Sequence, residues 1–252
     1  MTLPQVVRAL HITGPDSFEI VEKPLPDRKP GYSYAAPAYV GLCGTDLDLF
    51  DGSMPYFGEG VATYPLQPGH EWSGTLLEAN ARLEPGTRMI LDAVIDCGRA
   101  DCELCDAGLM VRCQERFEFG VRKGLDGAMA TAVAAPDRYM LPLPEGVRMR
   151  DAALVEPMVT TLEGIKRTAP VPGEEVLIVG SATLGLAGAM ILGAAITVAP
   201  FKYDPWGIPA ATVLLLSGFF VVSFWIGLTF LFPQGIKKIS LSKLMFWRRP
   251  GP

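Results

Sequence analysis

The chain has 252 residues, a formal net charge of −5 and a hydrophobic fraction of 49%, a composition that can bury one large core or two modest ones. Its basic residues do not alternate with aromatic residues, so no nucleic-acid partner is indicated. Residues 201–252 hold six basic side chains and one acidic side chain, Asp204, so this tail is expected to have a different environment from the acidic remainder.

All five cysteines lie between Cys43 and Cys113. An odd number of cysteines packed this closely fits a metal site better than a disulfide framework, and it predicts a reducing, cytoplasmic environment for this part. Residues 1–14 lack the apolar core of a signal peptide, so export by that route is not expected.

The first part of the chain has the pattern of a mainly β domain. Residues 5–40 alternate short apolar runs with Pro and Gly, which predicts antiparallel strands and turns. The next turn is expected to lead into a short helix that Thr45 or Asp46 caps. A loop over 51–69, rich in Gly, Pro and aromatic residues, then brings His70 to the start of a strand.

The pattern becomes helical after four further strands. A helix is predicted over 151–167, where apolar residues recur three and four positions apart. Two prolines and a glycine then interrupt the chain before an apolar strand over 175–180. The four strands are predicted at residues 70–79, 88–95, 127–135 and 138–144.

The most specific motif is a loop with four cysteines at spacings of x4, x2 and x7. Four thiolates can close a tetrahedral structural zinc site that leaves no position open for a substrate. Such a metal would hold together a lobe with little core of its own. The four residues are Cys97, Cys102, Cys105 and Cys113.

A second set of metal-binding residue types is spread along the chain, at Cys43, in Gly69-His70-Glu71 and at Glu156. A catalytic zinc takes about three protein ligands and keeps one position open, and Cys, His and carboxylate are suitable ligands. Each residue alone is a weak signal, but together with the four-cysteine loop they predict a second zinc.

The segments GLCGTDLDLFDG, PGHEWSG, the cysteine loop and ALVEPM occur in an order that resembles the zinc-dependent medium-chain dehydrogenases. The polyol, threonine and glucose dehydrogenase branches are the most similar, and the resemblance covers roughly residues 5–185. It implies a GroES-like β-barrel with a few helices as the zinc-binding catalytic domain, over residues 1–170.

The resemblance also implies roles for single residues. Glu71 would be a nearby carboxylate that can approach the metal, Thr45 would pass on the substrate proton, and Asp46 would orient His70. Zinc would act as a Lewis acid while a small alcohol or sugar gives a hydride to NAD or NADP. The implied ligands of the catalytic zinc are Cys43, His70 and Glu156.

A dinucleotide-binding loop is expected after the zinc domain, but its pattern is altered. The middle glycine of G-x-G-x-x-G is replaced by Ala182, between Gly180 and Gly185. Only 67 residues follow, and no acidic residue other than Asp204 could hold the ribose. We therefore expect a truncated cofactor domain, with a Rossmann-like start over 171–201.

Two long uncharged runs allow a different interpretation of the same region. A transmembrane helix is predicted over 207–233, and the basic residues of 234–252 predict a cytoplasmic tail behind it. A cytoplasmic zinc domain then requires residues 176–201 to cross the membrane as well, as the first half of a helical hairpin. The same residues cannot be both nucleotide loop and membrane span, and a fusion to an unrelated segment is a third alternative.

Two functions therefore remain open. The first is a zinc-dependent alcohol or polyol dehydrogenase that uses NAD or NADP, alone or with a partner subunit or as a homo-oligomer. The second is a zinc-binding structural or assembly subunit without catalysis, anchored in a membrane through residues 176–233. Binding of the nucleotide would distinguish the two.

Overall fold

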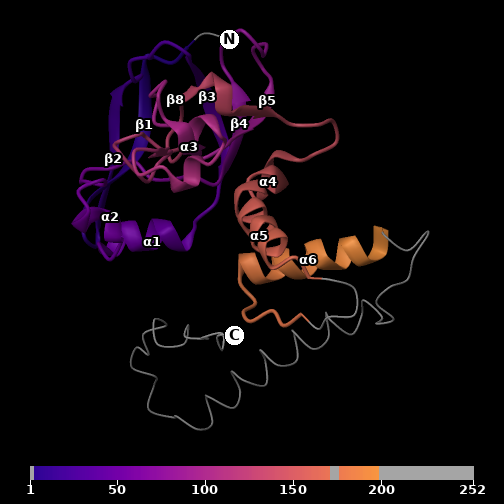
Figure 1. Cartoon of the computed structure of the whole chain (residues 1–252). Coiled ribbons are helices and arrows are strands. Elements are labelled where there is room, and N and C mark those ends of the chain that lie inside the picture. The colour runs from indigo at the N-terminus through magenta and orange to yellow at the C-terminus, as the bar shows by residue number, and fades with distance from the viewer. Residues whose placement is uncertain (1–2, 171–175, 199–252) are drawn as a thin grey trace, which may run out of the picture. The chain divides into compact units, whose positions relative to one another are not determined.

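Residues 3–170 and 176–198 are described in this computed structural model (Figure 1). The contacts between residues divide the chain after Thr160 into a first unit, residues 1–160, and a second unit, residues 161–252. Each unit is described by itself.

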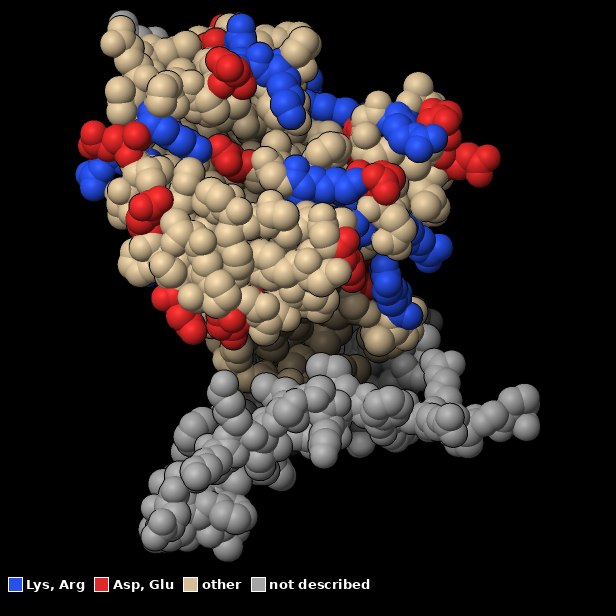
Figure 2. Space-filling model, turned by 90° about the vertical axis from the view of Figure 1, so that its left-hand side faces the viewer, with Lys and Arg blue, Asp and Glu red and all other residues tan. Residues whose placement is uncertain are grey.

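The first unit opens with an antiparallel hairpin of β1 (Val6–Gly14) and β2 (Ser17–Pro24). Its outer strand exposes Phe18 and Ile20, whereas Ile12 on the inner strand is buried. Figure 2 shows the side of the molecule that lies at the left of Figure 1, where Lys and Arg are interspersed with Asp and Glu around a broad uncharged area.

A five-stranded sheet in the order β8–β3–β4–β5–β9 forms the centre of the first unit. All neighbouring strands are antiparallel, which confirms the expectation of a mainly β domain. The strands are β3 (Tyr32–Val40), β4 (Trp72–Leu76), β5 (Arg88–Leu91), β8 (Val133–Pro136) and β9 (Met140–Pro142).

The main core lies on this sheet, where alternate strand residues are buried. Trp72 stacks on Phe119, with ring centroids 5.8 Å apart. Leu76, Met89 and Met140 are fully buried beside them. Burial of side chains of this size stabilises the fold by about 1.5–3 kcal/mol each.

All four of these predicted strands are shorter than expected, and local hydrogen bonds explain two of the cases. The Asp92 side chain accepts a bond from the Val94 N–H at 3.1 Å, an Asx turn that ends β5. The residues before Val133 pair with the loop that precedes His70, since the Ala128 and Met129 N–H groups donate to the Gly69 and Pro68 carbonyls.

Two short helices, α1 (Gly44–Asp51) and α2 (Pro55–Gly58), share a second hydrophobic cluster around the buried Leu49. The Cys43 N–H donates to Asp46 Oδ2 at 2.9 Å at the start of α1, so Asp46 helps to cap this helix as expected and Thr45 does not.

A small lobe carries the cysteines. Its strands β6 (Val94–Ile95) and β7 (Phe117–Glu118) pair with each other, and α3 (Glu103–Asp106) and the 3₁₀ helix η1 (Met110–Arg112) lie between them in sequence. Leu104, Leu109 and Val111 are exposed in this lobe, which therefore has a small core.

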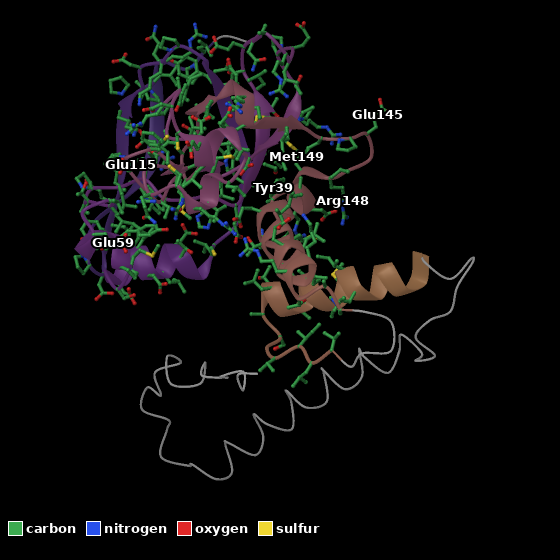
Figure 3. All side chains as sticks on the ribbon, in the orientation of Figure 1. Tyr39, Glu59, Glu115, Glu145, Arg148 and Met149 are labelled. Carbon is green, nitrogen blue, oxygen red and sulfur yellow. The ribbon has the colours of Figure 1, made fainter. Side chains whose placement is uncertain are left out.

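The last elements of the first unit follow the 3₁₀ helix η2 (Asp137–Tyr139) and β9. Helix α4 (Met149–Ala152) lies against β3 and β4 (Figure 3). The Ser73 hydroxyl donates to the Met149 carbonyl at 2.5 Å. Helix α5 (Val155–Thr168) confirms most of the helix predicted over 151–167, whose first two residues belong to α4 instead.

The second unit contains α6 (Thr183–Val198), and here two expectations change. The strand predicted over 175–180 is not observed in residues 176–180, because a strand needs a hydrogen-bonded partner and none pairs with it among the described residues. Within 3–170 and 176–198, no helix is both long and apolar enough to cross a bilayer.

The membrane interpretation of 176–201 is therefore not supported in its described part. The helix in this run has 16 residues, whereas a bilayer requires about 20. The predicted span over 207–233 and the basic tail over 234–252 lie outside the described residues.

Candidate metal centres

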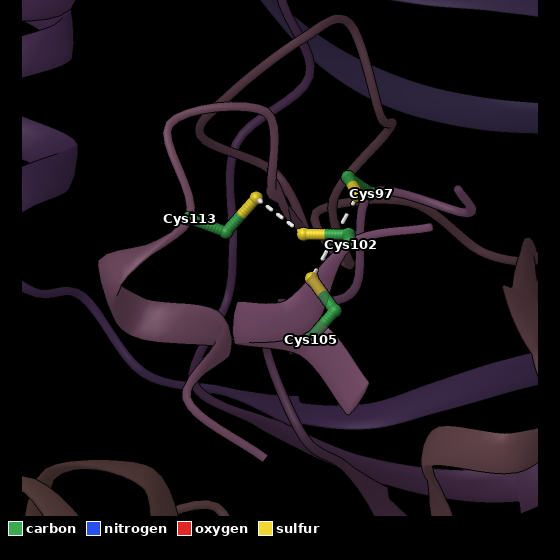
Figure 4. A group of neighbouring side chains, drawn as sticks. All are labelled: Cys97, Cys102, Cys105 and Cys113. Carbon is green, nitrogen blue, oxygen red and sulfur yellow. Dashed lines mark hydrogen bonds between the residues drawn. The ribbon is translucent and has the colours of Figure 1, made fainter. Parts of the chain in front are cut away.

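The four cysteines of the small lobe come together around one point (Figure 4). The Sγ atoms of Cys102 and Cys113 are 3.7 Å apart, as are those of Cys105 and Cys97. A zinc ion with four sulfur ligands at about 2.3 Å has ligand–ligand distances of about 3.8 Å. No disulfide joins these cysteines, so this four-cysteine group fits a tetrahedral zinc.

The thiols of this group differ in acidity. A hydrogen bond from the Cys105 backbone is the main cause that lowers the pKa of Cys102 to about 7. A hydrogen bond from the Cys97 backbone lowers the pKa of Cys105, but burial and hydrogen bonds with the other three thiols together raise it to about 12. A metal that binds here must therefore displace protons at neutral pH.

A second group consists of Cys43, His70 and Glu71, here called the Cys43 group. Their ligand atoms all lie within 4.8 Å of one another. His70 and Glu71 are 7% and 5% exposed, and Cys43 is half-buried. A thiol, an imidazole and a carboxylate supply three ligands and leave a fourth position, which fits a catalytic type of zinc site.

Asp46 organises the Cys43 group. It is 4% exposed, and its carboxylate accepts hydrogen bonds from the N–H groups of Cys43 and Gly69 at 2.9 and 3.3 Å. Its Oδ1 lies 3.6 Å from His70 Nδ1, which is an ion-pair distance and too long for a hydrogen bond. The buried Nδ1 has no hydrogen-bond partner, so a small movement of the ring would satisfy both atoms.

The charge on His70 depends on these neighbours. Burial alone would lower the pKa of His70, but attraction to the side chains of Asp46 and Cys43 outweighs it and raises the pKa to about 10. The metal-free imidazole is therefore protonated at neutral pH, and metal binding there also displaces a proton.

Two glycines make room for the Cys43 group. A Cβ at Gly41 would lie 2.5 Å from Glu71 Oε2 and 3.1 Å from Glu71 Cβ. Gly69 has a φ of +102°, which L side chains rarely adopt, and it directs the chain into His70.

The structure places Glu156 and Thr45 near this group but not within it. Glu156 lies in the first turn of α5, half-buried and outside the set of three ligand atoms. Burial raises its pKa, His70 lowers it, and Glu71 raises it, so the carboxylate lies within the field of the group. Thr45 is half-buried on α1.

The predicted cofactor loop forms a tight turn in the second unit. Gly180 has a φ of +112°, and a Cβ at Gly185 would lie 2.0 Å from the Gly180 carbonyl oxygen. The Leu186 N–H donates to the Ala182 carbonyl at 3.0 Å as α6 begins.

Sequence reasoning missed a partly buried network beside the four-cysteine group. It contains Tyr56, Arg116 and Glu118, joined by three hydrogen bonds, and Arg122 with its guanidinium 5.2 Å from the centre of the Tyr56 ring. The run from Arg116 to Arg122 carried no motif, and only its alternation of charge with apolar residues could have drawn attention to it.

Comparison with known proteins places the first unit in a known domain family. Residues 30–145 match the family described as "Alcohol dehydrogenase GroES-like domain". A protein of Haemophilus influenzae named as an uncharacterized zinc-type alcohol dehydrogenase-like protein is 26% identical over 188 residues, which are 73% of this chain and 52% of that protein. L-Galactonate-5-dehydrogenase of Escherichia coli K12 is 32% identical over 166 residues, 64% of this chain and 46% of the enzyme.

A solved structure has the same fold. A protein of Sinorhizobium meliloti 1021 described as a "putative zinc-binding dehydrogenase" and bound to NADP superposes with a TM-score of 0.67 at 26% identity, over 76% of this chain and 54% of that one. The chain spans about half the length of the curated relatives that it matches. The chain is thus similar to zinc-type alcohol dehydrogenases, and its residues 30–145 match the alcohol dehydrogenase GroES-like domain.

Proposed function

We propose that this chain carries the metal-binding and alcohol-binding part of a zinc-dependent alcohol or polyol dehydrogenase, which transfers a hydride from a small alcohol or sugar to NAD or NADP. The observation that carries this proposal is the Cys43 group, in which three suitable ligand atoms meet in a buried site. Names of relatives such as L-galactonate-5-dehydrogenase support a polyol or sugar acid as the substrate class.

The geometry of the Cys43 group and the resemblance to zinc-dependent dehydrogenases support the following roles. Zinc, when bound, would supply Lewis-acid polarisation of the substrate alcohol. Cys43, His70 and Glu71 would hold it, with Glu156 as a further carboxylate that faces the same charges. Thr45 would relay the hydroxyl proton of the substrate, taking it up as its own hydroxyl proton is passed on towards solvent. The four-cysteine group would hold a second zinc that keeps the small lobe folded.

The turn from Gly180 to Gly185 supports a nucleotide-contacting role for the second unit. A close approach between a glycine carbonyl and a helix start brings backbone N–H groups to a place where pyrophosphate can bind. We propose that residues 180–185 form this contact, with Ala182 in place of the glycine that usually allows the closest approach.

Metal analysis of the full chain tests the central proposal. The wild-type chain should hold two zinc ions, and His70→Ala should hold one, because the Cys43 group loses its only imidazole. His11 is the only other histidine and hydrogen-bonds Lys23, so His11→Ala is a matched control that should keep both ions. Two zinc ions in His70→Ala would show that this group is not a metal site.

Nucleotide binding tests the catalytic half of the proposal. Saturable binding of NADH or NADPH by the zinc-loaded chain, followed by fluorescence of the nicotinamide, is the expected result. A chain that holds two zinc ions and binds neither nucleotide would be a metal-binding domain without the proposed hydride transfer.

A further inference from the structure

The partly buried network beside the four-cysteine group joins two parts of the domain that are far apart in sequence. The Arg116 guanidinium donates to the Cys113 carbonyl at 3.0 Å and to the Tyr56 hydroxyl at 3.0 Å. Its Nε bonds Glu118 Oε1 at 2.6 Å, and the Tyr56 hydroxyl donates to the same oxygen at 3.2 Å. Arg116 therefore connects the last cysteine of the four-cysteine group directly to α2.

Partial burial strengthens the electrostatic interactions within this network. The side chains of Arg116 and Glu118 are 13% and 16% exposed, so their ion pair is much less screened than a surface pair. Arg122 is 3% exposed, lies against the Tyr56 ring, and donates to the Gln114 carbonyl at 2.6 Å. Tyr56 is thus fixed through both its hydroxyl and its ring by residues that follow Cys113.

Helix α2 is in turn fixed to α1. The Met54 N–H donates to the Asp48 carbonyl at 3.0 Å, and the Tyr64 hydroxyl donates to the Leu49 carbonyl at 2.7 Å. Tyr56 packs against the same hydrophobic cluster as Leu49. Helix α1 begins directly after Cys43 and carries Asp46. The position of this helix therefore determines where the ligand Cys43 and its hydrogen-bond partner Asp46 lie.

We propose that Arg116 is a positioning residue that couples the two metal centres, so that zinc in the four-cysteine group orders α2 and α1 and thereby favours zinc in the Cys43 group. The coupling runs from the Cys113 carbonyl through Arg116 and Tyr56 to α1. It rests on the proposed function, because it requires zinc at the four cysteines. By linkage, loosening α2 must weaken the four-cysteine metal by the same factor.

Hydrogen exchange on the full chain tests the coupling with zinc as the probe. The experiment uses the Cys43→Ser variant, in which the Cys43 group lacks one of its ligands. Removal of zinc by a chelator then reports on the four-cysteine group. We expect that removing this zinc with a chelator lowers the protection of residues 54–62 about 5- to 150-fold, the usual range of coupling between sites. In Cys43→Ser/Arg116→Met the same treatment should change the protection less than twofold.

Arg99→Met in the same background is the matched control. Arg99 also lies in the cysteine loop, but its side chain is 62% exposed and pairs with Asp101. This variant should respond to chelation like its parent. Arg116→Lys keeps one charged donor and should restore part of the response, which a merely structural defect would not.

Tyr56→Phe gives a second measurement that does not depend on how well Arg116→Met folds. The variant loses the hydroxyl and keeps the ring against Arg122. Its affinity for zinc at the four cysteines should fall by the same factor by which chelation lowers the hydrogen-exchange protection of residues 54–62 in the Cys43→Ser variant. Unchanged protection of 54–62 after the zinc is lost, or unchanged zinc affinity in Tyr56→Phe, would overturn the coupling and leave the proposed function intact. A Cys43→Ser chain that never holds zinc would overturn the coupling and the proposed zinc of the four-cysteine group, and would leave the Cys43 group to be judged by the His70→Ala metal analysis.

Discussion

At the scale of single residues, the Cys43 group depends on one buried carboxylate. Asp46 accepts two backbone hydrogen bonds and lies 3.6 Å from His70 Nδ1, so it fixes the helix start, the loop before His70 and the imidazole together. Partners of this kind orient a metal ligand and increase its basicity, and their loss typically costs 10- to 100-fold in metal affinity.

The first residue-scale prediction concerns Asp46→Asn. The neutral amide loses the attraction that raises the pKa of His70 to about 10, so this pKa should fall towards 6.5, and zinc affinity at the Cys43 group should fall about 10- to 100-fold. Since the chain has only two histidines, proton NMR of the metal-free protein resolves the titration. A His70 pKa that stays near 10 in this variant would rule out Asp46 as its cause.

The sign of the pH dependence follows from the same shift. A histidine whose pKa is raised on folding stabilises the metal-free fold fully below about pH 6.5 and loses this contribution as the pH rises through 10. The metal-free wild-type chain should therefore lose stability between these values, measured by denaturant unfolding, and Asp46→Asn should lose less. Equal losses in the two proteins would contradict the assignment.

The second residue-scale prediction concerns Gly41→Ala. The added methyl would meet Glu71 Oε2 at 2.5 Å and Glu71 Cβ at 3.1 Å, so the carboxylate must move out of the Cys43 group. Zinc affinity should fall about 10- to 100-fold while the melting temperature of the metal-free chain changes little. Gly44→Ala is the control, because a Cβ there meets no atom within 4 Å. Equal zinc affinity in the two variants would show that Glu71 is not a ligand.

At the scale of elements, local hydrogen bonds decided where several strands end. The Asx turn at Asp92 ends β5, and pairing of Ala128 and Met129 with residues 68 and 69 delays the start of β8. This pairing also holds the loop that carries His70. Strand β8 is therefore shorter than its apolar sequence pattern predicts, because the backbone before it is hydrogen-bonded to the loop that carries His70.

The turn before α6 gives an element-scale prediction. Gly185→Ala places a methyl 2.0 Å from the Gly180 carbonyl oxygen, which forces the turn open and should abolish binding of NADH or NADPH. Gly193→Ala, on the same helix, adds a methyl that meets no atom within 4 Å and should bind as the wild type does. Nicotinamide fluorescence titration measures both. Tight binding by Gly185→Ala would remove residues 180–185 from the nucleotide site.

At the scale of the whole molecule, the small lobe has a limited core and exposes several large apolar side chains. Metal binding then supplies folding free energy, because the thiolates meet only in the folded state. A ligand present at about 1,000 times its Kd stabilises a fold by about 4 kcal/mol. Removing zinc should therefore lower the melting temperature in calorimetry, and more so in the wild type than in Cys97→Ser. Identical melting with and without zinc would contradict a structural metal.

The sequence by itself determined the mainly β first unit, the helix after residue 151 and which residue types could bind metal, because these depend on local periodicity and on motif spacing. The convergence of the four cysteines on one loop was accessible for the same reason. The resemblance implied Glu156 as the third ligand with Glu71 nearby, whereas the ligand atoms that meet in the structure are those of Cys43, His70 and Glu71.

Only the tertiary structure decided that Glu71 lies with Cys43 and His70, because Gly41 leaves space for its side chain and α5 holds Glu156 outside the three-residue set. Only the structure joined Tyr56 to Arg116, which are 60 residues apart in the chain. Contacts of this kind depend on how loops pack across a domain, and the periodicity of the sequence does not predict them.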